Sequence, residues 1–377
     1  MRLALAEIRR AKLRFGLLIG AVALLVFLIL FQQGLAGSLV GQFIGGLQRQ
    51  SATVLVYNAD ARRSVDASRV LPSQVAEVAK VPGVAASGPI GEATFSARLA
   101  TGELKDTTVF GYRLGGPGSP TTLSDGRLPA GPGEAVASSS DAGAGYGIGQ
   151  TITVVPGDTE ITIVGLADDI QFNVQPTLFV SYGTYEHLVK ATNPAATGVL
   201  PNLVGVEPMS GVDPVSLSAT ITQQVAGVEA LDRATAVASL PGVSSIQQSF
   251  GIILGLAFVV VVLLTGFFFL IITVQKLSSL TLLRAVGASG GFLLRNLVLQ
   301  VVLVIVAALA IAIPLTLLSI SAASSAAFTA RIEPKIVILT AFAILLLGIV
   351  AAFGAMRRVA KIDPAAATSR LTGGGLE

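Results

Sequence analysis

The most regular feature of the chain is a set of four long hydrophobic runs. A helix that crosses a membrane needs about 20 largely apolar residues, and each run reaches or approaches that length. The runs are Phe15–Phe31, Phe250–Val274, Leu297–Ala323 and Ile336–Met356. They predict transmembrane helices over residues 15–36, 250–274, 292–323 and 336–356. Pro314 predicts a kink inside the third helix.

The first run also has features of a secretory signal peptide, because a basic segment precedes it. A signal peptide usually has an apolar stretch of only about 7–15 residues. The run from Phe15 is unbroken to Phe31, and the helical pattern continues through Leu35 and Leu39. These features favour a retained transmembrane helix over a cleaved leader.

Residues 37–249 have a different pattern, in which short β-rich runs alternate with helical ones. The expected strands are Thr53–Tyr57, Thr107–Tyr112, Glu134–Ala137, Thr151–Val155, Ile161–Leu166, Thr177–Ser181 and Leu203–Val206. The expected helices begin at Pro72 and cover Tyr182–Lys190 and Val215–Val225, and Gly115–Gly133 is expected to be a loop. The fold class is therefore membrane α-helical: four transmembrane helices plus an α+β extracytoplasmic domain inserted between helices 1 and 2.

Two Pro-Gly turns in this domain follow helical patterns. The sequences AKVPGVAAS, near residue 80, and VASLPGVSSI, near residue 240, each predict a helix, a turn and a strand. They indicate either a duplicated element in one sheet or two unrelated turns, since Pro-Gly is a common turn sequence.

Composition supports a membrane protein. Hydrophobic residues make up 52% of the chain and charged residues 12%, whereas soluble chains carry about 25% charged residues. An ordinary soluble enzyme is therefore excluded, and so is a disordered chain, which needs low hydrophobicity. The chain has no cysteine, which excludes disulfides and thiolate metal sites.

Charge is distributed unevenly along the chain. Residues 1–14, 275–296 and 357–377 hold 12 basic and 3 acidic residues together, and residues 37–249 hold 11 basic and 18 acidic ones. By the positive-inside rule both termini and the 275–296 connection are cytoplasmic, and residues 37–249 and the 324–335 loop lie outside. The basic balance thus marks a membrane face, and no nucleic-acid partner is expected.

Catalytic motifs are absent from the sequence. There is no phosphate-binding loop and no zinc-protease motif, and the single histidine is His187. The Ser138–Asp141 run has no second imidazole available as a base, and the Asp168–Asp169 pair has too few oxygen ligands for a cation site. We expect no catalytic residue, no metal site and no cofactor bound by this chain.

Glycines recur at four-residue spacing near the first two spans. The pairs are Gly16 with Gly20 and Gly251 with Gly255, and Gly37, Gly41 and Gly45 form a double step. Such spacing lets a second backbone approach closely, although some matches arise by chance in a Gly-rich chain. The pairs predict close packing of these spans on each other or across a dimer. Gly348 in the fourth run is expected to matter less.

The cytoplasmic segments have amphipathic patterns. Residues 1–14 predict an interfacial helix, with a plain basic tail as the alternative. Residues 275–291 predict a second short helix with an apolar face that lies on lipid or docks into a groove of a cytosolic protein. Its residues of interest are Leu280, Leu283, Arg284, Val286 and the C-capping Gly287.

Several motifs resemble a known family. The run LTLLRAVGAS at Leu280–Ser289 resembles the cytoplasmic signature of FtsX/MacB-type ABC transporter permeases, and RRVAKIDPAAA at Arg357–Ala367 resembles their basic ending. The layout of one span, a large outer domain and three further spans is similar as well. Within the superfamily the nearest likeness is to the HrtB-type haem-exporter permeases and their DevC-type relatives, over nearly the whole chain.

The resemblance implies the permease subunit of an exporter in a bacterial cytoplasmic membrane. A separate ABC ATPase subunit would use ATP and Mg²⁺, and two permease copies would form a 2+2 complex with it. The 275–291 segment would be the coupling helix that contacts the ATPase. The rival interpretation is a membrane-anchored signalling or tethering protein whose outer domain binds a partner.

The substrate implied is hydrophobic or amphiphilic, with haem as one candidate, and it would enter laterally from the membrane. Polar residues that could meet it are scarce, and each of them also has an ordinary structural role available. The candidates are Gln32, Gln33, Tyr182, Tyr185 and Glu333, with His187 and Met209 as further ligands for iron.

Overall fold

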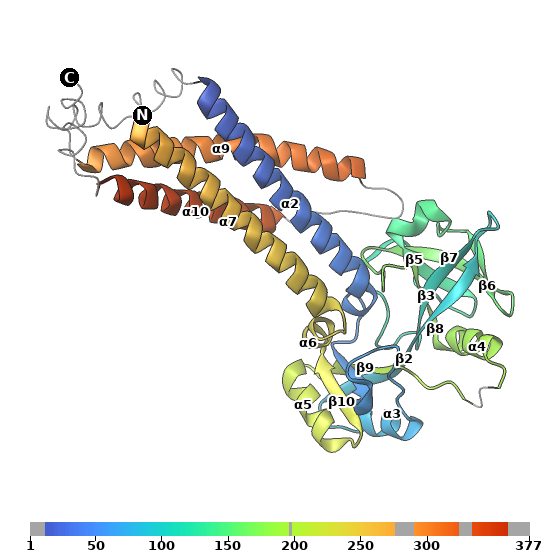
Figure 1. Ribbon diagram of the computed structural model, residues 1–377. Coiled ribbons are helices and arrows are strands. Elements are labelled where there is room, and N and C mark those ends of the chain that lie inside the picture. The colour runs from blue at the N-terminus through green and yellow to red at the C-terminus, as the bar shows by residue number, and fades with distance from the viewer. Residues whose placement is uncertain (1–11, 196–197, 276–289, 324–333, 361–377) are drawn as a thin grey trace, which may run out of the picture. The chain divides into compact units, whose positions relative to one another are not determined.

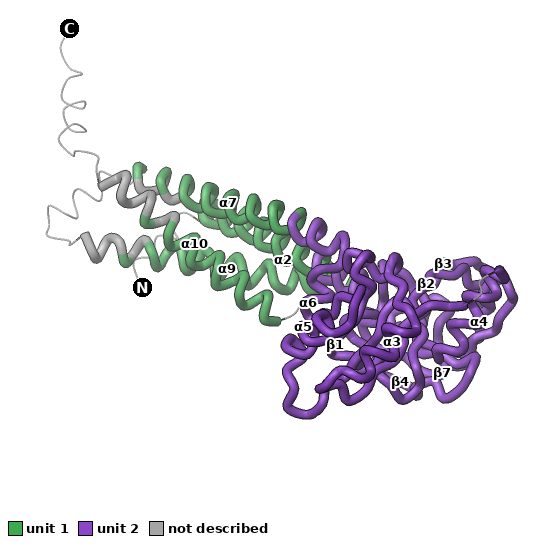
Figure 2. The backbone as a smooth tube through the Cα atoms, turned by 90° about the horizontal axis from the view of Figure 1, so that it is seen from below, with its two compact units in different colours: residues 1–35, 249–323, 330–377 green, residues 36–248, 324–329 purple. Residues whose placement is uncertain are grey.

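The computed structural model describes residues 12–195, 198–275, 290–323 and 334–360 (Figure 1). The chain divides into two compact units (Figure 2). The helical unit comprises residues 1–35, 249–323 and 330–377, and the sheet unit comprises residues 36–248 and 324–329. Each unit is described by itself below.

Four helices make up the described part of the helical unit. They are α2 (Lys12–Gln48), α7 (Val243–Gln275), α9 (Gly290–Ala323) and α10 (Pro334–Ala360). Segments long and apolar enough to cross a membrane lie at Lys12–Gln48, Val243–Phe268 and Val298–Ala322, among the residues described. The apolar part of α10, Pro334–Val350, is shorter, so the fourth span stays a prediction.

The helical unit packs around one face of α2. Its side chains at Phe15, Leu18, Val22, Val26 and Ile29 are buried, at the three- and four-residue spacing of one helix face. They form one cluster with residues of the other three helices: Val261 of α7, Val301, Val304, Ile305 and Ala308 of α9, and Ile344 of α10.

The glycine pairs near the first two spans do not mediate this packing. No heavy atom outside the local helix lies within 4 Å of a Cβ built at Gly37, Gly41, Gly251 or Gly255. The expectation that these glycines pack α2 on α7 within one chain is therefore wrong, and packing across a dimer stays a prediction. Gly348 does face a neighbouring helix, because a Cβ there would overlap the Ile305 side chain of α9; a smaller effect of Gly348 on export stays a prediction.

The sheet unit begins and ends with a repeated pattern of strand, helix and strand. The first repeat is β1 (Val54–Asn58), α3 (Pro72–Val78) and β2 (Val84–Arg98), and the second is β9 (Leu203–Pro208), α5 (Pro214–Gln224) and β10 (Val228–Asp232). The strands pair antiparallel in the order β10-β1-β9-β2, which is the ferredoxin-like arrangement. We call this the first lobe.

A repeated strand–helix–strand element is present, but it is not the pair expected at the two Pro-Gly turns. In the first copy α3 leads through Gly83 into β2, and in the second α5 leads through Gly227 into β10; the two glycines have φ of 97° and 75°. The Pro-Gly turn at Gly242 follows α6 (Arg233–Ala238) and leads into α7. The strand expected after it is therefore wrong.

The second lobe is inserted between β2 and β9. It contains β3 (Leu104–Tyr112), β4 (Leu123–Gly126), β5 (Glu134–Ser138), β6 (Thr151–Val155), β7 (Thr159–Ala167), β8 (Thr177–Ser181) and α4 (Tyr182–Thr192). A short 3₁₀ helix, η2 (Ser139–Ala144), lies in this lobe, and another, η1 (Ala59–Ala61), follows β1 in the first lobe. All seven expected strands are present, and β2 begins at the strand expected after the first Pro-Gly turn. Strands β4 and β10 were not expected, and β4 lies inside the expected loop. The long strand β2 joins both lobes into one ten-stranded sheet.

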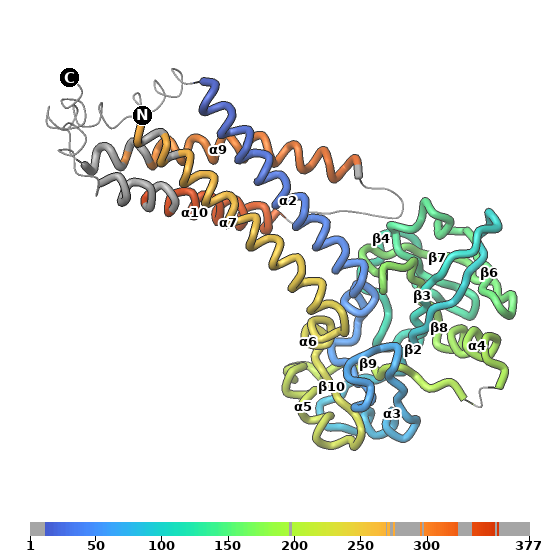
Figure 3. The backbone as a smooth tube through the Cα atoms, viewed as in Figure 1, coloured from blue at the N-terminus to red at the C-terminus, as the bar shows by residue number. Residues whose placement is uncertain are grey.

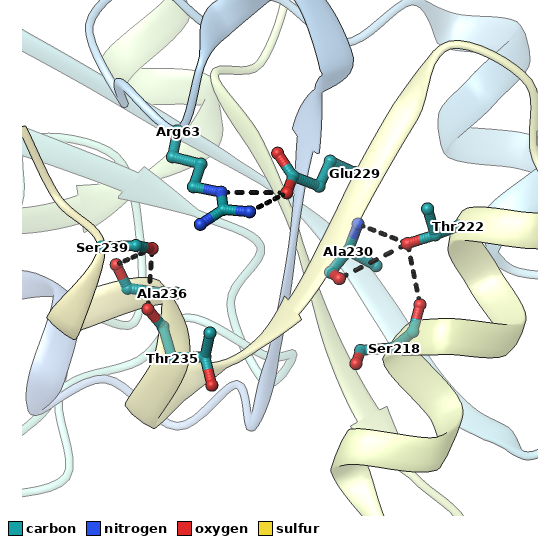
Figure 4. Close-up of polar contacts among 8 residues, drawn as sticks. All are labelled: Arg63, Ser218, Thr222, Glu229, Ala230, Thr235, Ala236 and Ser239. Carbon is teal, nitrogen blue, oxygen red and sulfur yellow. Dashed lines mark hydrogen bonds and ion pairs between the residues drawn. The ribbon is translucent and has the colours of Figure 1, made fainter.

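One outer edge of the sheet is closed by a helix. The Thr222 hydroxyl of α5 accepts a hydrogen bond from the Ala230 amide of β10 at 2.9 Å and donates to the Ser218 carbonyl oxygen at 2.9 Å (Figure 4). Beside it, the Arg63 guanidinium pairs with Glu229 at 2.7 Å. An edge amide that is already bonded cannot recruit another strand.

The two faces of the first lobe carry different layers. On one face, Val54 and Val56 pack with α3 and α5. On the other face, Leu55 and Tyr57 belong to a core with Ile44 and Leu47 of α2 and with Leu240 and Val243 where α6 leads into α7. Figure 3 follows the chain from α2 into β1 and from β10 through α6 into α7. The ends of two apolar helices are therefore built into the core of the sheet unit.

Candidate functional site

The candidate coupling residues Leu280, Leu283, Arg284, Val286 and Gly287 lie outside the described residues, as does Glu333. The nearest described contact joins the ends of two helices beside this segment. Arg14 at the start of α2 donates a hydrogen bond to the Gln275 side chain at the end of α7, at 2.5 Å.

Gln32 and Gln33 use their amides to join helices. Gln32 donates through Nε2 to the carbonyl oxygen of Phe250 in α7 at 3.3 Å. Gln33 accepts through Oε1 from the Thr340 hydroxyl of α10 at 2.9 Å. Hydrogen bonds between membrane helices contribute about 0.6 kcal/mol on average. These contacts favour a packing role over a substrate-binding role for both residues.

Tyr185 is part of the core of the second lobe. Its ring covers the cross-strand pair Gly91 and Gly111, where a Cβ would overlap it. Its hydroxyl lies 3.2 Å from both the Glu92 carbonyl oxygen and the Asn202 side-chain oxygen, and it donates to them. Burial raises the pKa of the Tyr185 phenol above its usual value. Its burial and its hydrogen bonds favour a packing role for Tyr185, and a substrate-facing role stays a prediction.

The other candidate iron ligands do not converge. Tyr182 donates to the Val199 carbonyl oxygen at 3.4 Å, and burial raises the pKa of its phenol. His187 is exposed on α4, and Met209 is 51% exposed beyond the end of β9 in the other lobe. No group of three or more His, Cys, Asp or Glu side chains arranged to hold a metal occurs among the described residues.

The Ser138–Asp141 run forms a buried polar cluster without a base. Asp141 in η2 is 3% exposed, and each of its carboxylate oxygens accepts from Gln171 Nε2 at 2.9 Å. Ser139 donates to the Asp168 carboxylate. Burial raises the pKa of the Asp141 carboxyl to about 6. The cluster therefore holds the segment after β7 in place, and its residues are not arranged for nucleophilic chemistry.

A second buried carboxyl was missed by sequence reasoning. Glu92 in β2 is 3% exposed, and burial followed by the neighbouring Asp66 raises the pKa of its carboxyl to about 9. The residue is therefore neutral near pH 7. A single acid within a run of small residues was the only signal for it.

These observations define a class of protein first: a polytopic membrane protein whose apolar helices extend into a large inserted domain. Two family models then match the chain. The MacB-like periplasmic core domain matches residues 15–224 and the FtsX-like permease C-terminal region matches residues 251–364. The first covers more than half of the 377 residues. The chain belongs to the MacB-like and FtsX-like family of ABC transporter permeases, which confirms the family inferred from the motifs.

Several individual proteins are similar to this chain. An uncharacterized ABC transporter permease of Mycobacterium tuberculosis is 26% identical over 300 residues, covering 77% of this chain and 76% of the relative. The putative hemin transport system permease protein HrtB of Staphylococcus haemolyticus is 21% identical over 365 residues, covering 97% and 98%. The periplasmic region of MacB from Actinobacillus actinomycetemcomitans is similar with a TM-score of 0.36 at 15% identity, over 51% of this chain and 92% of that one.

Proposed function

We propose that this chain is the permease subunit of an ABC-type exporter that moves a hydrophobic or amphiphilic substrate outward with a separate ATPase subunit. The observation that carries the proposal is the shared core of the sheet unit, which contains the ends of both α2 and α7. A displacement of either helix must therefore disturb the core around it. Family membership supports the dependence on an ATPase subunit.

The proposal includes a homodimer of four-span permeases with both termini in the cytoplasm. The segment 275–291 would contact the ATPase through Leu280, Leu283 and Val286, with Arg284 beside this apolar face. Apolar side chains along α7 support a surface in contact with lipid or a second copy, since Ile252, Leu256 and Leu263 are each more than half exposed.

Haem is the substrate we favour, because a relative along the whole chain is named for hemin transport. Entry from the membrane suits an amphiphile. In the described part of the helical unit, the buried polar side chains are few and include Gln300 and Thr316. This scarcity of buried polar side chains in the described part supports entry of the substrate from the membrane.

The experiment is co-purification of the full chain with an ATPase, followed by haemin titration of the complex in lipid. We expect ATPase activity that rises with haemin and a shift of the Soret band at micromolar haemin. Failure to bind any ATPase would contradict the exporter and favour a tethering protein. A bound ATPase without a Soret shift would contradict haem alone.

A further inference from the structure

The segment between β7 and β8, residues 168–175, lies along the last turns of α2, and we call it the strap. Its backbone bonds directly to that of the helix. Gly46 N donates to Gln171 O at 2.9 Å, Asn173 N donates to Phe43 O at 3.2 Å, and Val174 N donates to Gln42 O at 3.1 Å. The strap is thus bonded to α2 through backbone groups of the last two turns of the helix.

Two glycines make this close approach fit. A Cβ at Gly45 would stand 2.7 Å from the Gln171 carbonyl oxygen and closer still to that of Asp169. A Cβ at Gly46 would stand 2.7 Å from the ring of Phe110. The backbones of the helix and the strap are therefore in direct contact. Side chains larger than glycine at positions 45 and 46 would keep the two backbones apart.

The strap is held in a costly conformation. Asp169, Asn173 and Val174 have φ of 56°, 52° and 59°, in the left-handed region that residues other than glycine rarely adopt. A β-branched residue such as Val174 is a marked outlier there. Such residues persist where the surrounding structure over-determines them, and they cluster where function needs a fixed geometry.

The other side of the strap is fastened to the second lobe. Gln171 donates to both oxygens of Asp141 at 2.9 Å. Thr122 donates to the Asp168 carbonyl oxygen at 2.5 Å, and Phe172 N donates to the Thr177 hydroxyl at 2.8 Å. The strap therefore connects the second lobe to a helix that runs unbroken from Lys12 to Gln48.

We propose that the strap is the joint that makes the second lobe and the first membrane span move together, with Gln171 and Asp141 as its positioning residues. The role of this joint in transport rests on the proposed exporter function. The coupled movement of the second lobe and the first span does not, and it can be measured in the absence of an ATPase.

The test uses distances between spin labels on the full chain in lipid nanodiscs. Because the chain has no cysteine, pairs of introduced cysteines can be labelled without background. One pair joins Leu28, which is exposed in α2, to Lys190, which is exposed in α4. The control pair joins Lys190 to Thr151 of β6, so both of its labels lie within the second lobe.

Three variants probe the contact. Gln171→Glu places two carboxylates together, Gln171→Glu with Asp141→Asn restores a carboxylate–amide contact with the partners exchanged, and Gln171→Met removes the donor at similar size. We expect Gln171→Glu and Gln171→Met to broaden the Leu28–Lys190 distribution at least twofold, and the double variant to restore it. The control distribution should stay constant throughout.

Two results would overturn the joint. The first is an unchanged Leu28–Lys190 distribution in both Gln171→Glu and Gln171→Met. The second is equal broadening of the control pair, which would make Gln171 a residue of domain stability alone. Loss of haemin-stimulated ATPase activity in Gln171→Met, with basal activity kept, would link the joint to export. A chain that binds no ATPase would contradict the exporter and leave the distance result standing.

Discussion

Gly45→Ala and Gly41→Ala are a matched pair of changes in one helix, one turn apart. In a helix interior, replacing Gly by Ala stabilises by about 0.5–1 kcal/mol. Gly41 has open space around the Cβ position, so its variant should show that gain. At Gly45 the new methyl meets two backbone carbonyl oxygens. These oxygens cannot turn away as a side chain would.

Overpacking of this kind costs about 1–3 kcal/mol. After the helix gain is subtracted, Gly45→Ala should weaken the contact between α2 and the strap by about 1–2 kcal/mol. Because both variants share the helix gain, they should differ by the overpacking cost alone, about 1–3 kcal/mol. Because tenfold in an equilibrium is about 1.4 kcal/mol, local opening should become about 10-fold more frequent in Gly45→Ala.

The assay is hydrogen exchange of the full chain in nanodiscs, read at the amides of Gly46, Asn173 and Val174. Protection there should fall about 10-fold in Gly45→Ala and hold or rise in Gly41→Ala. Amides of the β3 strand report whether the lobe as a whole is intact. Equal protection in both variants would refute the argument from close approach. A larger loss in Gly41→Ala would instead point to a dimer contact at that glycine.

Three further predictions address other parts of the chain. Glu92→Gln should be nearly neutral at pH 4, where the carboxyl is protonated in both the folded and the unfolded chain. The folded pKa of Glu92 is raised from 4.5 to about 9, so its stabilising contribution is complete below pH 4.5 and is lost as the pH rises toward 9. Thermal unfolding should accordingly show the wild type losing about 2–3 kcal/mol more than the variant between pH 6 and pH 8. Gly348→Leu should lower the thermal stability of the helical unit by about 1–3 kcal/mol through overlap with α9, whereas Gly255→Leu should not; equal melting temperatures would contradict this. Leu283→Asp should abolish ATPase binding in pull-downs while membrane insertion persists, because a buried unpaired carboxylate costs several kcal/mol; normal binding would remove Leu283 from the interface.

The sequence was most informative where local chemistry decides structure. Strands rich in Val, Ile and Thr were predicted close to their observed bounds, since those side chains favour strands. Only the start of strand β2 was expected, and its long continuation was missed because VAASGPIGEATFSAR is rich in Ala, Gly and Ser. That strand is stabilised by pairing with β3, β6 and β9, which only the tertiary fold supplies.

The candidate site shows the same limit. Gln32 and Gln33 stand out as polar residues in an apolar run, but their partners lie 218 and 307 residues away in sequence. Gly41 and Gly45 look identical by spacing. What separates them is the strap, which approaches Gly45 and not Gly41 and comes from a distant part of the chain. The four-residue spacing therefore predicted close backbone packing at these glycines. It could not predict which glycine makes that contact.

The insertion of the second lobe between β2 and β9 sets the order in which the protein can be made. Strand β1 pairs only with β9 and β10, and Ile44 and Leu47 share their core with Val243. The first lobe must therefore wait unfinished until its last strand leaves the ribosome, which takes on the order of 10 s at normal synthesis rates. During that time the core that packs around the end of α2 is incomplete. Completion of the fold and the arrival of α7 thus coincide, so the second apolar helix emerges just as the domain that holds it closes.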